Sequence, residues 1–423
     1  MFGNGRIYYG CPWRYAACGV ASRTLGCAWS GTDDSGQLAG AHEAEKEVAM
    51  HNVIWTKRYR GWLISVVCLV MATAFVVVSR LDTYGLERRV SEPFAFEANG
   101  LLLSGTLWLP DQAATAAVVL VHGDGPQDRT SQQGYDPLIN ALLDAGVAVV
   151  SWDKPGIGDS QGNWLNQSMT DRSVNVRSAV STLRSKLQAI PVGVLGFSQA
   201  GWVLPRLTPG SADFLVLVGG AVSWQRQADY YTRTRLQRAG MSEPDIERVM
   251  AQMAAADEVL FASSQVPPAA LLGSMSPERW AFVRRNLHED ATDELKKLKI
   301  PVLALWGADD LNVNPEINAD IYRKTVGGNH PANRIEVIPD ATHGLLRSTP
   351  YNTQLTSQWP WLTTLRFLME GRHAYAQASL KRYPGGFLQE QAGVRLASRQ
   401  MRLPYCFALS SQRVSPVQEC QRC

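Results

Sequence analysis

The sequence predicts a doubly wound α/β fold, with a mainly parallel sheet and an inserted helical cap. Six short, apolar, β-branched runs are separated by stretches that are mostly helical in pattern. They occupy residues 116–121, 146–152, 192–195, 214–218, 301–306 and 334–338. Runs of this kind are typical of strands that are covered on both faces by helices. Residues 99–110, ahead of these runs, are expected to form two short strands or a hairpin.

The cap is predicted from one interval, residues 223–298, that is too long for a simple crossover. Helices are expected to start at Ser242, with Asp245 three residues later, and at Ser276, which is followed by proline and glutamate. Each start supplies an N-cap and then an early proline or acid. Five apolar residues share one helical face and are interpreted as cap core rather than substrate contacts: Val249, Met250, Met253, Leu260 and Phe261.

The chain of 423 residues is longer than one ordinary domain. We assign the α/β domain to residues 94–370. Residues 1–49 lack a sustained apolar period and are expected to be disordered or extra sequence, with a natural start at Met50. Residues 385–423 show no convincing periodicity and receive no function.

An uncharged apolar run at residues 61–79 follows a basic cluster of Lys57, Arg58 and Arg60. Its length suits a helix that crosses a bilayer. A cleavable signal sequence is the alternative, although its small-x-small site would be expected after the run, whereas Ala72-Thr73-Ala74 lies inside it. We expect an uncleaved membrane anchor with a cytoplasmic N-terminus and an extracytoplasmic domain, periplasmic or at the cell surface.

Composition excludes several function classes. The formal net charge of +3 over this length gives no reason to expect a nucleic-acid partner. All seven cysteines lie outside residues 69–405, and their spacing matches no zinc ribbon or redox motif. The domain is therefore expected to depend on neither disulfides nor a cysteine-ligated metal.

Ser198 is the candidate nucleophile. It stands in Gly196-Phe-Ser198-Gln-Ala-Gly201, directly after the strand run at 192–195. A serine on a sharp strand-to-helix turn needs small residues two positions before and after it, because the backbone is crowded there. Glycine precedes it at that spacing, and Ala200 follows. Pro205 falls within the first turns of the helix that is expected next.

A serine hydroxyl is a poor nucleophile unless a base and an orienting acid assist it. Both follow in the expected order at the carboxyl ends of later strands. Asp309 and Asp310 come after the run at 301–306, and His343 comes after the run at 334–338. Parallel α/β sheets build their sites at this edge. His343 is therefore the predicted base, with one of the two aspartates as its acid.

The tetrahedral intermediate of acyl transfer also needs two N–H donors for its negative oxygen. The backbone amide of Gln199, directly after the nucleophile, is one candidate. The second is expected from the loop that follows residues 116–121. We favour the amide of Asp124, with Gly125 as the alternative, and expect the Asp124 carboxylate to point away from the oxyanion.

Four motifs together resemble the α/β hydrolases of the serine aminopeptidase and dienelactone hydrolase-like kind. They are the loop His122-Gly-Asp-Gly-Pro-Gln-Asp-Arg129, the turn Asp153-Lys-Pro-Gly-Ile-Gly-Asp-Ser160, the serine elbow, and the Asp310 and His343 loops. The resemblance implies that Asp310, three residues after a glycine, is the acid, and that Asp309 is a turn residue. Family members usually carry serine where this chain has Asp124. The turn at 153–160 resembles a structural turn beside the active site.

The resemblance implies cofactor-free hydrolysis of a small-molecule acyl substrate through an acyl-enzyme. In that mechanism Ser198 attacks, His343 transfers the proton and Asp310 orients the imidazole. A carboxylesterase is the first interpretation, and an aminopeptidase or acyl-CoA thioesterase is the second. A catalytically inactive, membrane-anchored binding protein is the alternative from another class.

Overall fold

The computed structural model describes residues 59–78 and 84–376. The expectations for residues 1–49, for Met50 and for residues 385–423 lie outside this range. The chain divides into two compact units, residues 1–72 and 73–423.

An apolar helix occupies Tyr59–Val78 and is long enough to cross a membrane by length and composition. Twenty residues of α-helix extend about 30 Å, the thickness of a bilayer's hydrocarbon core. Its side chains are exposed, apart from the half-buried Val77. Ser79, the last residue of the predicted anchor, lies outside the described residues.

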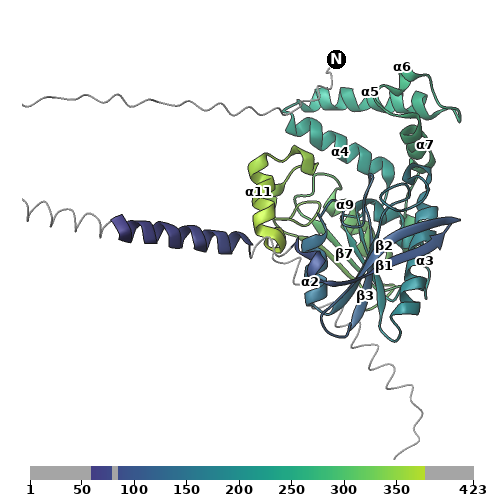
Figure 1. The fold of residues 1–423 in the computed structure, drawn as a ribbon. Coiled ribbons are helices and arrows are strands. Elements are labelled where there is room, and N and C mark those ends of the chain that lie inside the picture. Colours follow the sequence, from purple (N-terminus) through teal and green to yellow (C-terminus); the bar gives the residue numbers. More distant parts are fainter. Residues whose placement is uncertain (1–58, 79–83, 377–423) are drawn as a thin grey trace, which may run out of the picture. The chain divides into compact units, whose positions relative to one another are not determined.

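One sheet in the described part of the chain holds eight strands in the order β1-β2-β4-β3-β5-β6-β7-β8 (Figure 1). The strands are β1 (Val90–Ala98), β2 (Leu101–Leu109), β3 (Ala116–Val121), β4 (Val147–Trp152), β5 (Val192–Phe197), β6 (Leu215–Val218), β7 (Val302–Gly307) and β8 (Arg334–Ile338). The pairs from β4 through to β8 are parallel, and β1, β2 and β4 pair antiparallel. The predicted mainly parallel sheet is confirmed.

The hairpin lies earlier in the chain than expected. Residues 99–110 hold only one strand, β2, and its antiparallel partner β1 precedes them. Asn99 and Gly100 form the two-residue turn, with φ of 52° and 72°. Asparagine and glycine tolerate this left-handed backbone, which matches the twist of a tight hairpin. The Asn-Gly pair therefore forms the turn between β1 and β2, whereas the prediction placed it at the start of the hairpin.

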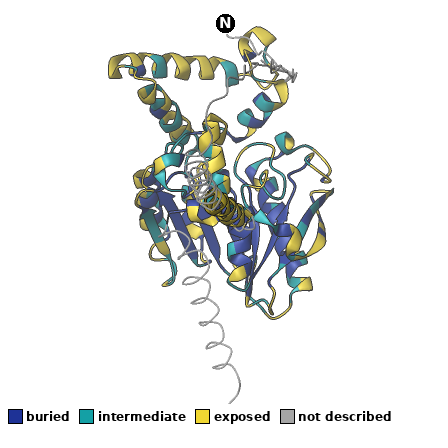
Figure 2. Ribbon diagram, turned by 60° about the vertical axis from the view of Figure 1, so that its left-hand side comes forward, coloured by how far each residue is buried: buried dark blue, intermediate teal, exposed yellow. Residues whose placement is uncertain are grey.

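Helices cover both faces of the sheet and form two apolar cores. On β3, Ala117, Val119 and Val121 face one core, whereas Val118 and Leu120 face the other. The helices around the sheet are α2 (Asp136–Asp144), α3 (Met169–Lys186), α9 (Pro315–Thr325), α10 (Ser348–Tyr351) and α11 (Trp361–Glu370). Short 3-10 turns are η2 (Leu86–Arg88), η3 (Trp164–Asn166), η4 (Ser198–Trp202), η5 (Leu204–Arg206), η6 (Thr356–Gln358) and η7 (Gly371–Ala374). The central strands, β3 to β7, are the most buried part of the fold (Figure 2).

The segment between β6 and β7 is helical. It contains α4 (Trp224–Arg238), α5 (Glu243–Phe261), α6 (Ala269–Leu272), α7 (Pro277–Asn286) and α8 (Thr292–Lys297). Ser242 and Ser276 cap α5 and α7, each accepting a hydrogen bond from the amide three residues on. Both predicted helix starts are thus confirmed.

The interpretation of the α5 apolar face as cap core is wrong for Met253, which is 38% exposed. The other four residues of that face are only half-buried, and Ile246 is the buried residue of α5. The helix lies against α4 on one side and leaves most of its surface to solvent (Figure 2). Periodicity located the shared face correctly but gave no information on what covers it.

Candidate active site

Ser198 stands where β5 ends, with its backbone in the left-handed region at φ 50°. The turn is tight: a Cβ placed on Gly196 would lie 2.6 Å from the Cβ of Ala200. That spacing is too short for two carbon atoms, so glycine is required two residues before the serine. A strained backbone at a sharp turn after a strand is typical of a nucleophile elbow.

The helix expected after Ser198 is absent from this described segment. Two short 3-10 turns, η4 and η5, take its place, and Pro205 lies in the second. Proline has no N–H to donate and its ring clashes with the preceding helical turn, so an α-helix cannot continue through it.

Asp310 and His343 lie together at the ends of β7 and β8. Nδ1 of His343 is 2.7 Å from Oδ2 of Asp310, whose side chain is fully buried. The other carboxylate oxygen of Asp310 accepts hydrogen bonds from the amides of Asn312 and Val313, at 2.7 and 2.9 Å. The phenol of Tyr230, from α4, donates to the Asp310 carbonyl at 2.7 Å. The aspartate is thereby held in one orientation toward the imidazole.

The imidazole of His343 extends over the carboxyl end of β6, which is the neighbour of the strand that carries Ser198. A Cβ on Gly219, directly after β6, would lie 2.8 Å from Cε1 of His343. Gly219 also has φ 59°, so the close approach of the ring requires glycine there.

The pKa of His343 reflects two opposing effects. Burial lowers it, but the charge of Asp310 and its hydrogen bond outweigh burial and raise the pKa above its ordinary value. The aspartate therefore stabilises the protonated imidazole, the form that a general base reaches after it removes a proton.

Asp309 and Asp340 lie close in sequence to Asp310 and His343, but both form hydrogen bonds with Ser348 that stabilise the loops after β7 and β8. The carboxylate of Asp309 accepts a hydrogen bond from the hydroxyl of Ser348 at 2.5 Å. Asp340 has φ 51°, and its carbonyl accepts from the amide of Ser348 at 2.9 Å. Of the two adjacent candidate acids, the one that contacts His343 is Asp310.

The loop after β3 is held from beneath by two buried cations. Nζ of Lys154 donates to the carbonyls of Gly123 and Gly125 at 2.6 and 2.8 Å. Arg172, from α3, donates to the carbonyl of His122 at 2.5 Å and also to the side chain of Gln199. Burial lowers the pKa of Lys154 well below its ordinary value, and that of Arg172 to about 10.

This arrangement favours Asp124 over Gly125 as the second amide donor. The carbonyl of Gly123 faces Lys154, so the N–H of Asp124, on the other side of the same trans peptide, faces the opposite way. The N–H of Gly125 is turned to the Asp124 carboxylate. A Cβ on Gly123 would lie 3.3 Å from the Cβ of Ser198, which places this loop against the nucleophile.

The carboxylate of Asp124 is bound by Arg279, a residue of α7. Nη1 and Nη2 of Arg279, from α7, donate to its two oxygens at 3.1 and 2.8 Å. The side-chain amide of Gln199 adds a third hydrogen bond at 3.2 Å. Burial raises the pKa of Asp124, but the hydrogen bonds and charge of Arg279, with the charge of Lys154, outweigh it and lower the pKa. The carboxylate of Asp124 is thus ionised, and Arg279 and Lys154 compensate its negative charge beside the two candidate donor amides.

His122 is a structural residue of the same loop. Its Nε2 lies 2.6 Å from the carbonyl of Trp152, and its ring stacks on Tyr135. Burial, and next the charge of Lys154, lower its pKa to about 3. The ring is therefore neutral, and Nε2 carries the proton that it donates to the carbonyl.

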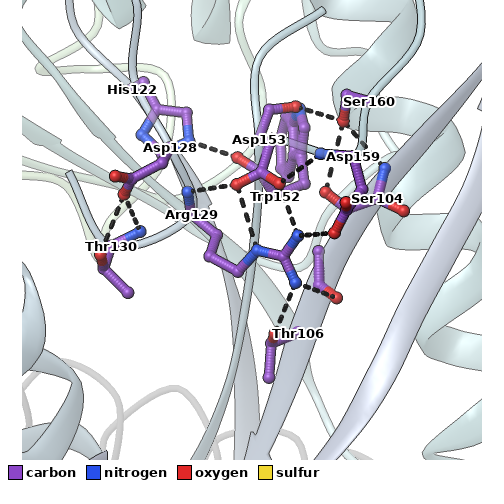
Figure 3. A network of polar contacts seen from close by, with 11 residues as sticks. Ser104, Thr106, His122, Asp128, Arg129, Thr130, Trp152, Asp153, Asp159 and Ser160 are labelled. Atoms are coloured by element: carbon purple, nitrogen blue, oxygen red, sulfur yellow. Dashed lines mark hydrogen bonds and ion pairs between the residues drawn. The ribbon is translucent and has the colours of Figure 1, made fainter. Parts of the chain in front are cut away.

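The turn at 153–160 forms a polar network with Arg129 (Figure 3). The guanidinium of Arg129 donates to both oxygens of the buried Asp153, at 3.1 and 2.5 Å, and contacts Asp159 at 3.2 Å. The hydroxyl of Ser160 donates to the carbonyl of Asp153 at 2.7 Å. The network ties this turn to the loop after β3.

A cavity of about 430 Å³ opens beside Ser198. Its walls include the rings of Trp202, Trp224 and Tyr231, the side chain of Leu355, and the Asp124–Arg279 pair. Among the described residues, no group of three His, Cys, Asp or Glu side chains is arranged to hold a metal ion.

The sequence predicted that Ser198, Gln199, Asp124, Asp310 and His343 lie at one edge of the sheet. It did not predict the cationic side chains around them. Lys154 lay in a motif interpreted as a turn, and Arg172 and Arg279 lay in helices without a motif. The available signal was Asp124 itself, because an aspartate beside an oxyanion site requires a cationic partner.

Comparisons with known proteins agree with this geometry. A family model described as serine aminopeptidase, S33, matches residues 112–349, more than half of the chain. The chain is similar to esterase EstD of Thermotoga maritima, with 24% identity over 272 residues that make up 61% of this chain and 63% of that protein. It therefore spans less than two thirds of the length of this curated relative.

Solved structures with a similar chain course include the Pyrococcus furiosus esterase Pf2001, at 16% identity and a TM-score of 0.46, covering 70% of this chain and 92% of that one. Dienelactone hydrolase from Anabaena variabilis gives 15% identity and a TM-score of 0.38, covering 69% and 100%. The family match is consistent with the parallel sheet, on which Ser198, Asp310 and His343 follow β5, β7 and β8. On that match, the chain belongs to the serine aminopeptidase S33 family of α/β hydrolases.

Proposed function

We propose that this chain is a serine hydrolase that cleaves a carboxylic ester with a small or medium acyl group. His343 removes the proton of Ser198 as its oxygen attacks the ester carbonyl. The amides of Gln199 and Asp124 bind the resulting oxyanion. His343 then returns the proton to the leaving alcohol, and water releases the acyl group by the same steps.

The observation that carries this proposal is the 2.7 Å contact between His343 and the buried Asp310. Such a pair orients an imidazole and stabilises its protonated form, and neither effect is needed in a binding protein. The strained backbone of Ser198 and the neutralised Asp124 beside it also support a site built for acyl transfer.

An ester is favoured over a peptide with a free N-terminus by the charge of the cavity. An aminopeptidase needs an anion to receive the substrate's ammonium group. The acidic residue that lines this cavity, Asp124, is already bound on both oxygens by Arg279. The aromatic walls instead suit an uncharged acyl or alcohol group.

The test is a comparison of kcat/KM for matched acyl groups presented as a p-nitrophenyl ester, a thioester and an aminoacyl anilide. The ester is expected to give the highest value. Ser198→Ala should lose at least about 10³-fold while the protein stays folded, whereas the control Ser185→Ala, on the exposed side of α3, should not change. A preference for the anilide or the thioester would refute the ester assignment. Equal rates for Ser198→Ala and wild type would refute the mechanism.

We also propose that the helix Tyr59–Val78 is an uncleaved anchor and that the hydrolase domain lies outside the cytoplasm. The helix's length and exposed apolar side chains support a membrane span. Washed membranes should retain the protein in carbonate and high salt, and protease added outside should reach the domain. Release by carbonate, or a mature N-terminus beyond Val78, contradicts the anchor.

A further inference from the structure

Helix α11 presents an apolar face outward. Trp361, Leu362, Leu365 and Leu368 are 72%, 59%, 47% and 37% exposed. Their spacing of one, four and seven residues places them on one side of the helix. A surface helix ordinarily turns its apolar stripe inward, so the exposed stripe on α11 requires an explanation.

The inner side of α11 has its own contacts, so the helix is not simply loose. Phe367 packs in edge or tilted geometry against Tyr84, Tyr351 and Trp359, with ring centroids 6.2, 5.9 and 5.3 Å apart. Glu370 binds Arg347 and Arg366. The helix, yellow-green in Figure 1, is thereby held against the domain through Phe367 and Glu370, while the apolar stripe stays exposed.

The chain ties this helix to the proposed anchor over a short distance. The phenol of Tyr84 donates to the carbonyl of Phe367 at 2.9 Å, so the start of the domain is fastened to α11 itself. Only residues 79–83 separate Tyr84 from the last residue of the helix Tyr59–Val78. Even fully extended, this connection spans at most about 20 Å. A bilayer crossed by that helix therefore lies within reach of α11.

The composition of the stripe suits the boundary between headgroups and acyl chains. Tryptophan is enriched at that depth, and the three leucines provide apolar area to bury. Arg347 and Arg366 share a single carboxylate, that of Glu370, which leaves positive charge beside the stripe. Anionic lipid headgroups would complement this charge.

We propose that the exposed face of α11 lies in the lipid interface, as a second membrane contact that holds the domain against the surface. This inference rests on the proposed anchor for its tether. It adds a surface, a partner and an orientation that the anchor alone does not define.

The experiment measures the depth of single fluorescent labels in the full-length protein, reconstituted in vesicles of phosphatidylethanolamine and phosphatidylglycerol. The seven native cysteines are replaced by alanine, and one cysteine at a time is introduced and labelled with NBD. Leu362→Cys reports on α11, and Val259→Cys, 64% exposed on α5, is the matched control. A variant that keeps only the native Cys68 reports on the anchor. Lipids with a spin label near the headgroup or deep in the acyl chain then quench each label.

The label at 362 should be quenched at least about twofold more by the shallow spin label than by the deep one, and the label at 259 should not be quenched. The label at 68 should respond to the deep one. Quenching at 68 without quenching at 362 overturns this inference but supports the anchor. In that case, blue-shifted fluorescence of the unquenched label at 362 means that a protein segment or a second copy of the chain covers α11 instead. Quenching at 362 without 68 overturns the anchor alone. No quenching at either position overturns both.

Discussion

Arg279→Ala should lower kcat for an ester about tenfold. In the structure, the guanidinium of Arg279 binds both oxygens of Asp124, the residue whose amide is proposed to stabilise the oxyanion. Without this cation, the carboxylate of Asp124 is left beside a second negative charge in the transition state. The ground state carries no such charge, so the loss falls on kcat rather than on KM.

The magnitude follows from covalent geometry. The amide and the carboxylate belong to one residue, so an oxyanion on that amide lies about 6 Å from the carboxylate. Two unit charges at that distance repel by about 3 kcal/mol at an effective dielectric constant of about 20. The Asp124 side chain is 47% exposed and Lys154 lies nearby, which reduces the repulsion to about half. About 1.5 kcal/mol remains, or roughly a tenfold change in rate.

The assay compares kcat and KM of the wild type and four variants on one p-nitrophenyl ester. Arg284→Ala is the control, because Arg284 lies on the same helix but donates to the carbonyl of Ser263. Asp124→Ser removes the anion, so Asp124→Ser combined with Arg279→Ala should recover to within about threefold of wild type. The reasoning is refuted if Arg279→Ala leaves kcat unchanged, or if the double variant loses as much as the two single variants together.

Three further predictions concern the remaining parts of the site. Asp310→Asn removes the charge that raises the pKa of His343, so that burial alone lowers this pKa. The acid limb of the pH profile of kcat/KM should therefore move to lower pH, and the plateau should fall about 10³- to 10⁴-fold. An acid limb that does not move contradicts the pairing of Asp310 with His343. Gly219→Ala should reduce kcat at least about tenfold, because the new Cβ crowds the imidazole of His343. Gly210 also has a positive φ but has open space around it, so Gly210→Ala should leave kcat unchanged and lower the free energy of unfolding by about 1 kcal/mol. Equal kcat values of the two variants contradict the placement of the ring. Arg129→Met should lower the free energy of unfolding by about 3–5 kcal/mol in denaturant titrations, because it leaves a buried carboxylate without its cation, and a loss below about 1 kcal/mol would show that the network in Figure 3 adds little.

Local sequence patterns predicted the strands and helix starts around this site. The run at 116–121 coincides with β3, and the caps at Ser242 and Ser276 form as expected, because a strand's apolar pattern and a helix start are encoded by neighbouring residues. The placement of Asp310 and His343 after two strands followed from topology, since parallel strands end at the same edge.

The parts that escaped prediction depend on contacts between distant residues. Arg279 and Asp124 are 155 positions apart, and no spacing rule joins a cap helix to a loop that follows the third strand. The exposure of Met253 depends on which elements cover α5, and the apolar pattern of that helix does not contain this information. After Ser198 the sequence predicts a helix with Pro205 in its first turns, but the missing N–H of this proline limits the segment to 3-10 turns.

The central claim is that Ser198 is a nucleophile activated by His343 and Asp310. The most direct measurement treats the folded, full-length protein with a fluorophosphonate and locates the adduct by peptide mass spectrometry. The account predicts one phosphonyl group on Ser198, none on Ser198→Ala, and slower labelling of Asp310→Asn at neutral pH. Folded wild-type protein that stays unlabelled, or an adduct on a different serine, would contradict it.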